Sequence, residues 1–201
     1  MSKKVYLFDF DGTITSADTL LRFIRFACGT WRFLLGFFLF SPMIVAMKLN
    51  LCDNGMTKQK VFSWFFRGMS IDVFDNLCQR FATENFNLMR PKATDLLNRL
   101  FRDNEDIVIV SASLVNWVRP FFTHIQRDSK SNFHVLGTIP EVKDGVITGR
   151  FLTYNCYGAE KVHCIRRLYP DRQNYHFIAF GDSNGDKQML AFADESYYRI
   201  F

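Results

Sequence analysis

The sequence predicts an α/β fold, in which a doubly wound, mostly parallel sheet carries an inserted all-helical domain. From Pro91 onward, short β-rich apolar runs alternate with helical patterns. Residues 17–88, by contrast, show apolar side chains at three- and four-residue spacing and almost no strand signal. Strands joined through helices imply right-handed crossovers and parallel pairing. A chain of 201 residues is long enough for one such core with a smaller inserted lobe.

The first predicted strand covers residues 4–10, a short β-rich run that ends at Gly12. Helical spacing follows in LLRFIRFA (20–27) and VFDNLCQRFATENF (73–86), with a turn at Asn54-Gly55 between helical blocks. We therefore expect a catalytic core made of residues 1–15 and 90–201, and a helical cap made of residues 16–89.

The remaining elements of the core are predicted from the alternation after Pro91. Asp144-Gly145 lies between two β-rich runs and predicts a hairpin within 133–151, and Pro120 is expected to kink or end the helix that contains it. The predicted helices are 92–102, 114–125, 158–169 and 187–194, and the predicted strands are 106–113, 175–183 and 196–201.

The composition is that of a globular protein, with 48% hydrophobic and 22% charged residues. A net charge of +5 suits a small phosphorylated substrate, a phospholipid or a membrane surface, although a solvated basic surface explains it equally simply. We expect no nucleic-acid partner, because the sequence has no arginine-rich run and no RNA-binding aromatic signature. Five scattered cysteines without a CxxC motif, and no secretory leader, predict a cytoplasmic location.

Phenylalanine is unusually abundant, with 23 copies, and part of this excess lies in FLLGFFLFSPMIVAM (33–47). This uncharged run has 15 residues, fewer than the roughly 20 that a membrane span needs, and we expect Pro42 to interrupt it. Buried cap helices are the first interpretation. A peripheral or re-entrant membrane contact is the second, and a true span is the least favoured.

Polar clusters follow three predicted strands, so parallel pairing would gather them at one edge of the sheet. Lys161, near the start of a predicted helix, could join them. The clusters are Asp9 with Asp11, Ser111 with Ser113, and Asp182 with Asp186. Converging carboxylates raise one another's pKa unless a cation offsets them, and oxygen ligands of this kind suit Mg²⁺. His163 and Cys164 are neighbours without the spacing of a zinc site.

The same set of residues suits phosphoryl transfer. Asp9 can attack phosphorus to form an aspartyl-phosphate, while Asp11 protonates the leaving oxygen and later takes a proton from water. The Ser111 hydroxyl, the Lys161 ammonium, and backbone N–H groups near Gly12 and Ala112 at helix starts can bind phosphate oxygens.

Each piece also has a simpler structural interpretation. Asp-x-Asp-Gly can form a turn or a calcium-type loop, and Ser111 or Ser113 can cap a helix that starts at Leu114. Lys161 can form a surface ion pair, and GDSNGD (181–186) can be a loop with a helix cap. We favour the active site because all four pieces follow the expected strand or helix in order.

Four ordered motifs resemble those of the haloacid dehalogenase superfamily, in its phosphoserine-phosphatase-like branch with a helical cap after the first motif. They are DFDGT (9–13), Ser111 in VSAS, Lys161 in AEKV, and GDSNGD (181–186). The resemblance implies that Asp9 is the nucleophile and Asp11 the acid/base. It also implies that Asp9, the carbonyl of Asp11, and Asp182 bind Mg²⁺, with Asp186 supporting the metal.

Within this branch, Asp11 favours a phosphatase, because a halide leaving group needs no acid. True phosphoserine phosphatases have glutamate where Asp18 stands, two glycines where Ala112 and Ser113 stand, and asparagine at Gly185. The chain is more similar here to the bacterial phosphatidylglycerophosphate phosphatases. Asp18 is expected either to contact substrate, as Gly12, Ala112 and Ser113 would, or to be a helix N-cap or first-turn acid.

The sequence thus predicts a Mg²⁺-dependent phosphomonoesterase acting on a lipid headgroup phosphate or on a small metabolite such as phosphoserine. The alternative is a non-catalytic protein that binds a membrane or a partner through its apolar cap. Phosphotransfer to an acceptor other than water is a third possibility.

Overall fold

A five-stranded parallel sheet forms the centre of the molecule. The computed structural model describes residues 2–49, 51–126 and 130–201. The strands are arranged in the order β3-β2-β1-β6-β7, with every neighbouring pair parallel. Their bounds are β1 Lys3–Phe8, β2 Asp106–Leu114, β3 Phe133–Thr138, β6 Tyr175–Gly181 and β7 Glu195–Tyr198. The predicted doubly wound parallel sheet is confirmed.

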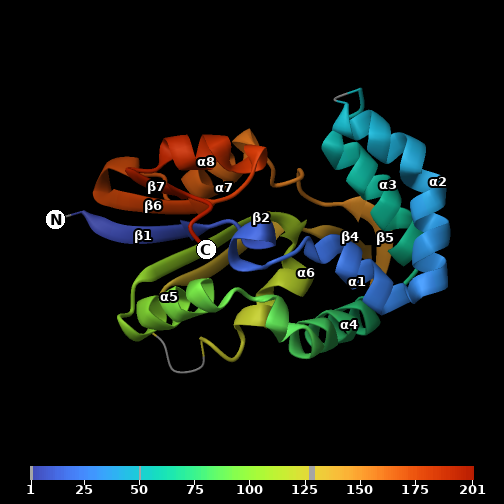
Figure 1. Ribbon diagram of the computed structural model, residues 1–201, viewed down its shortest axis with the longest axis horizontal. Coiled ribbons are helices and arrows are strands. Elements are labelled where there is room, and N and C mark those ends of the chain that lie inside the picture. Colours follow the sequence, from blue (N-terminus) through green and yellow to red (C-terminus); the bar gives the residue numbers. More distant parts are fainter. Residues whose placement is uncertain (1, 50, 127–129) are drawn as a thin grey trace.

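Helices cover both faces of this sheet (Figure 1). On one face lie α5 (Pro91–Arg102) and α6 (Val115–Val118), and on the other lie α7 (Ala159–Leu168) and α8 (Lys187–Phe192). β1 is buried on both sides, because Val5 and Leu7 pack in the cluster with α7 and α8, whereas Phe8 packs in the cluster with α5. This explains why the first strand is a near-continuous apolar run.

Four helices of the cap lie beyond the carboxyl ends of the strands (Figure 1). They are α1 Thr19–Cys28, α2 Thr30–Lys48, α3 Asn54–Phe66 and α4 Ile71–Glu84. Short turns complete the chain: η1 Phe10–Ile14, η2 Phe86–Leu88, η3 Arg119–Phe122, η4 Arg172–Asn174 and η5 Asn184–Asp186.

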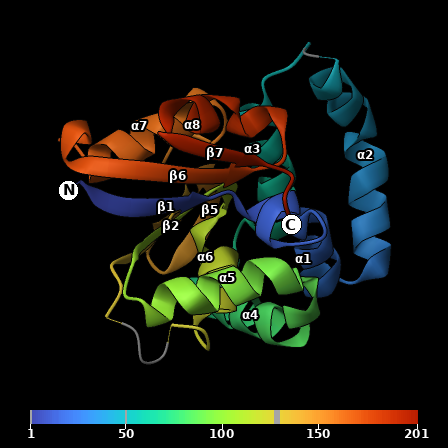
Figure 2. The ribbon, with the colours of Figure 1, turned by 60° about the vertical axis from the view of Figure 1, so that its left-hand side comes forward.

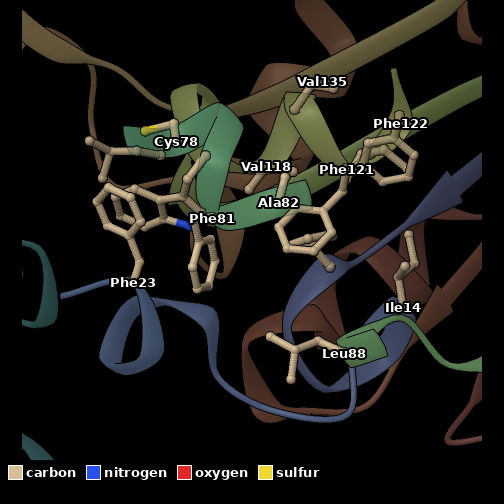
Figure 3. Packing of buried hydrophobic residues seen from close by; sticks show 14 of the residues in the cluster. Ile14, Phe23, Cys78, Phe81, Ala82, Leu88, Val118, Phe121, Phe122 and Val135 are labelled. Atoms are coloured by element: carbon tan, nitrogen blue, oxygen red, sulfur yellow. The ribbon is translucent and has the colours of Figure 1, made fainter. Parts of the chain in front are cut away.

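Aromatic side chains join the cap to the core (Figure 3). The ring of Phe23 in α1 stacks on Trp117 in α6, with centroids 4.9 Å apart, and Phe81 in α4 meets Phe121 at 5.8 Å. Such pairs add about 0.5–1.5 kcal/mol each beyond their buried area. Much of the phenylalanine content therefore serves the joint between cap and core.

The predicted hairpin is present, but it packs against the cap. Its strands are β4 Pro140–Lys143 and β5 Val146–Phe151, joined at Asp144 and Gly145, which both have positive φ. Gln59 of α3 accepts a hydrogen bond from the Phe151 N–H at 2.9 Å. The hairpin therefore extends the layer of cap helices, although it lies outside residues 16–89 in the sequence. The cap boundary at 16–89 stays a prediction.

The apolar segment 33–47 differs from its prediction in two ways. It forms part of one continuous helix, α2, which passes through Pro42. Pro42 cannot donate to the Phe38 carbonyl, but the Ser41 hydroxyl does so at 2.8 Å, which replaces the lost bond. The segment is also not buried: 6% of the window Thr30–Met47 is buried, because α2 lies on the outside of the cap (Figure 2). In the described residues, this window alone has the length and apolar composition of a candidate membrane span.

Several boundaries in the core also differ from the predictions, and two differ most clearly. The last strand ends at Tyr198, because Arg199 has a φ of +54° and leaves the extended conformation. The helix expected over 114–125 is short: α6 ends at Val118 and the chain continues as the 3₁₀ turn η3, with Pro120 in its first turn.

Candidate active site

The carboxyl ends of the three central strands carry the residues that the sequence singled out. Asp9 directly follows β1, Ser111 lies near the end of β2, and Asp182 directly follows β6. β1 pairs with both β2 and β6, so these residues come from neighbouring strands. The sheet therefore gathers them from positions up to 173 residues apart in the chain.

Three carboxylates form a compact cluster at this edge. Asp9, Asp182 and Asp186 each offer an oxygen within 4.8 Å of the others. Gly12 makes room for this approach: its φ is +85°, and a Cβ there would lie 2.5 Å from Oδ2 of Asp182. The Thr13 hydroxyl also donates to Oδ1 of Asp182 at 3.1 Å. The glycine of the first motif thus has a steric role.

Lys161, in the first turn of α7, is buried among these carboxylates. Its Nζ lies 2.5 Å from Oδ1 of Asp9 and 2.6 Å from Oδ1 of Asp186, and it donates to the Val110 carbonyl at 2.7 Å. Lys161 is 1% exposed, so the alternative of a solvated surface ion pair does not describe it.

The electrostatics of the cluster indicate a shortage of positive charge. Burial raises the pKa of Asp9 to about 7, and Lys161 offsets this only in part. Burial also raises the pKa of Asp182. For Asp186, burial would raise the pKa, but the contact with Lys161 and the hydrogen bonds from Ser183 together outweigh it and hold the pKa below its ordinary value. One lysine does not balance three carboxylates, so a divalent cation fits this oxygen-rich set.

The carboxylate of Asp11 is held in hydrogen bonds to α1 and β2. Its Oδ1 accepts from the Thr19 N–H at 2.7 Å and the Thr19 hydroxyl at 2.6 Å, and its Oδ2 accepts from the Ser113 hydroxyl at 2.5 Å. Among the described residues, the cluster of three carboxylates does not include it. The structure therefore brings together three of the four predicted acidic side chains, and the Asp11 carboxylate is oriented separately.

Ser111, Ala112 and Ser113 lie inside β2, which runs to Leu114. Ser111 is buried, and its hydroxyl oxygen accepts from the Ser113 N–H at 3.0 Å. The first turn of α6 has no side-chain cap, so the helix-cap interpretation of these serines is wrong. Gly12 lies in the turn η1 and Ala112 near the end of β2, so phosphate binding by the N–H groups near them stays a prediction.

Two acidic residues also have the capping roles considered for them. Asp18 is the N-cap of α1 and accepts a hydrogen bond from the Leu20 N–H at 2.9 Å. Asp186 closes a capping box with Ser183, whose N–H donates to Oδ2 of Asp186 at 2.9 Å. Since Oδ1 of Asp186 contacts Lys161, one carboxylate serves both the turn and the cluster.

Lys58 of α3 reaches the site from the cap, and the sequence analysis did not find it. Its ammonium donates to the carbonyl of Ala112, next to Ser111. Burial lowers the pKa of Lys58, and the nearby carboxylates of Asp11 and Asp18 partly counteract this. Lys60 lies two residues away on the same helix, and no sequence pattern distinguishes which lysine faces the site.

Comparison with known proteins places this geometry in a family. Residues 6–191 match the family model described as haloacid dehalogenase-like hydrolase. The chain belongs to the haloacid dehalogenase-like hydrolases. The superfamily that the four motifs indicated is therefore confirmed.

Relatives of this hydrolase support the assignment along the whole chain. Protein CicA of Caulobacter vibrioides is 33% identical over 199 residues, which cover 96% of this chain and 85% of CicA. A Bordetella pertussis Tohama I protein of unknown function has the same fold, with a TM-score of 0.80 and 15% identity, covering 98% of this chain and 89% of that one. A substrate-bound phosphoserine phosphatase complex has a TM-score of 0.63 and 18% identity, covering 98% and 86%. The expected fold is thus also confirmed.

Proposed function

We propose that this hydrolase is a Mg²⁺-dependent phosphatase that cleaves a phosphomonoester through an aspartyl-phosphate on Asp9. The observation that carries the proposal is the position of Asp9, which is buried at the end of the central strand and in contact with Lys161 inside a cluster of three carboxylates. A nucleophilic carboxylate with cationic neighbours is what attack on a dianionic phosphoryl group requires.

Asp9, Asp182 and Asp186 are the side chains that would hold Mg²⁺, and the family resemblance adds the carbonyl of Asp11. The cation would supply positive charge for the phosphate oxygens and for the carboxylates that Lys161 leaves uncompensated. Lys161 itself fixes the orientation of Asp9 through the 2.5 Å contact.

Asp11 has the surroundings of a positioned acid/base. The Thr19 hydroxyl and the Ser113 hydroxyl hold its two oxygens, and Trp117 in turn donates to the Thr19 oxygen at 3.2 Å. Asp11 would protonate the leaving oxygen in the first step and accept a proton from the attacking water in the second. Ser111 and Lys58 would bind the phosphoryl oxygens.

The substrate is either a small soluble phosphate ester or a phosphate on a lipid headgroup. The departures at Asp18, Ala112, Ser113 and Gly185 separate this chain from phosphoserine phosphatases, and the exposed apolar helix α2 favours a lipid. Five free cysteines support the cytoplasm as the location, with peripheral contact at the inner face of the membrane.

The test of the proposed function is hydrolysis of an aryl phosphate with Mg²⁺ and after chelation with EDTA. We expect turnover with Mg²⁺ and its loss with EDTA, restored by excess Mg²⁺. A panel of lipid phosphates and soluble phosphomonoesters would then identify the substrate class. Product analysis with added alcohols separates hydrolysis from phosphotransfer. Aryl phosphate turnover that is independent of a divalent cation would contradict the proposal.

The exposed surface of α2 favours one alternative, a non-catalytic protein that binds a membrane or a partner through its cap. That alternative predicts stable association and no hydrolysis of any substrate in the panel. The buried contacts of Lys161 with Asp9 and Asp186 count against it, because a binding surface on α2 does not require them.

Metal binding should be visible in stability as well as in activity. Because the pKa of Asp9 rises to about 7 in the fold, its ionisation costs stability as pH rises from about 4 to about 7 when no cation is bound. We expect Asp9→Asn to gain stability relative to wild type between pH 5 and pH 8 in EDTA. Mg²⁺ at 100 times its Kd should stabilise wild type by about 2.7 kcal/mol, which is about 5–10 °C in Tm at this chain length.

Thermal unfolding at both pH values, with and without Mg²⁺, measures this effect. Asp72→Asn on the exposed surface of α4 is the control and should follow wild type. An equal response of Asp9→Asn and wild type to Mg²⁺ would place the cation elsewhere.

Lys58 offers a separate test of phosphate binding by the cap. Lys58→Met keeps the length of the side chain but removes the charge, so we expect KM for a phosphomonoester to rise about tenfold, equivalent to about 1.4 kcal/mol. The change in kcat should be smaller. Lys60→Met, exposed on the same helix, is the matched control, and equal effects of the two substitutions would show that Lys58 has no specific role.

A further inference from the structure

The outer face of α2 exposes a continuous apolar stripe. Trp31, Leu35, Phe38 and Val45 are exposed, and their spacing of three, four or seven residues places them along one side of the helix, with the exposed Leu49 directly after its end. Trp31 is 86% and Phe38 80% exposed. Large apolar side chains aligned in this way on a protein surface mark a site of contact with a membrane or with another protein.

The opposite face of α2 packs against α3, and the two helices lie side by side (Figure 1). A Cβ on Gly36 would lie 2.4 Å from the ring of Phe65, so glycine allows the two helices to touch. Arg32 donates to the Phe65 carbonyl at 3.2 Å, and the ring of Phe40 meets Trp64 edge-on at 6.2 Å. Crossing a bilayer would require α2 to leave these contacts, whereas lying in the interface would not.

The segment of sequence that carries the stripe has charged residues of one sign only. Residues 19–52 contain four basic residues and no Asp or Glu, so this segment carries +4 of a total net charge of +5. Two of these, Arg22 and Arg25 of α1, line a hollow of about 500 Å³ together with Phe26 and Phe33. A pocket with arginines beside apolar rings suits an anionic headgroup with its first acyl carbons.

We propose that α2 lies in the plane of a membrane interface, with its exposed apolar stripe among the acyl chains and Arg22 and Arg25 on anionic headgroups. A second copy of this chain fits the surface less well. An isologous dimer would place the same basic segment of both copies face to face, without an acidic residue from residues 19–52 to balance it. This inference deepens the peripheral membrane contact proposed above and rests on it, but it does not depend on the proposed catalysis.

Co-sedimentation with vesicles tests the inference. We expect wild type to bind vesicles of phosphatidylcholine with about 30% phosphatidylglycerol more tightly than vesicles of phosphatidylcholine alone, and to lose the difference at high salt. The double variant Trp31→Ser, Phe38→Ser should bind the anionic vesicles at least about tenfold more weakly. The matched control is Val73→Ser with Tyr198→Ser, which removes exposed apolar side chains from α4 and β7 and should bind like wild type.

Arg22→Gln with Arg25→Gln should weaken binding to anionic vesicles and leave binding to neutral vesicles unchanged. Equal wild-type binding to both vesicle types, or unchanged binding by the Trp31/Phe38 variant, would overturn the inference. The inference would also be overturned if sedimentation velocity showed a wild-type dimer that the Trp31→Ser, Phe38→Ser variant no longer forms. Aryl phosphate hydrolysis should stay within about twofold of wild type in every variant, because none of these residues lies in the site. Failure to bind vesicles would therefore leave the proposed catalysis standing.

Discussion

Asp9→Asn is expected to lower kcat for any phosphomonoester by on the order of 10⁴-fold or more. The substitution replaces the attacking oxygen with an amide of nearly the same shape, and the Asn oxygen can still accept from Lys161, whose Nζ lies 2.5 Å from Oδ1 of Asp9. The fold should therefore persist while the nucleophile is lost. Steady-state kinetics with an aryl phosphate in excess Mg²⁺ measures the change.

Two further measurements make this result specific. Mass spectrometry of acid-quenched wild type should find a phosphoryl group on the peptide that contains Asp9, and Asp9→Asn should show none. Asp72→Asn, a neutralised carboxylate on the surface of α4, should retain full activity. Substantial turnover by Asp9→Asn would refute covalent catalysis at this position.

Asp11→Asn should have the second-largest effect, and its size should depend on the leaving group. An alkyl phosphate needs its alkoxide protonated, so we expect a loss of about 10²–10⁴-fold. The nitrophenolate released from a nitrophenyl phosphate needs no proton. Formation of the aspartyl-phosphate should therefore stay fast with this substrate, while hydrolysis of the aspartyl-phosphate slows. Rapid mixing should then show a burst of nitrophenolate equal to the enzyme concentration, followed by slow turnover.

Ser113→Ala is the matched comparison for this prediction. It removes the 2.5 Å hydrogen bond to Oδ2 of Asp11 but leaves the carboxylate in place. We expect a smaller loss, of about tenfold, and no burst, because Ser113 orients the acid and does not transfer the proton. Equal losses for alkyl and nitrophenyl substrates in Asp11→Asn, without a burst, would argue against Asp11 as the acid/base.

The sheet and the residues at its carboxyl edge could be predicted because both follow from local rules. Alternating strand and helix patterns imply parallel pairing, and parallel pairing brings strand ends such as Asp9 and Asp182 to one edge. Lys161 was predicted to join these strand ends, and its contact with Asp9 agrees with that prediction.

Features that depend on tertiary packing could not be predicted in the same way. Helical spacing in α3 does not reveal that Lys58, and not Lys60, points into the site, since that depends on how the cap lies against the core. The exposure of α2 was missed because an apolar run predicts burial, and nothing local shows that one face has no neighbour. At Pro42 the helix continues, and the Ser41 hydroxyl donates to the Phe38 carbonyl to which Pro42 cannot donate.

The strand order has a consequence for biosynthesis. β1 emerges first from the ribosome, yet one of its two partners, β6, is made about 170 residues later, as the pairing of Lys3 with Tyr175 shows. Until then β1 has an open edge and Asp9 lacks Asp182 and Asp186, so the nascent chain cannot complete the cluster of three carboxylates. Assembly of the central sheet must therefore wait until β6 has been translated. A ribosome stalled before β6 would hold β1 with one open edge that chaperones recognise.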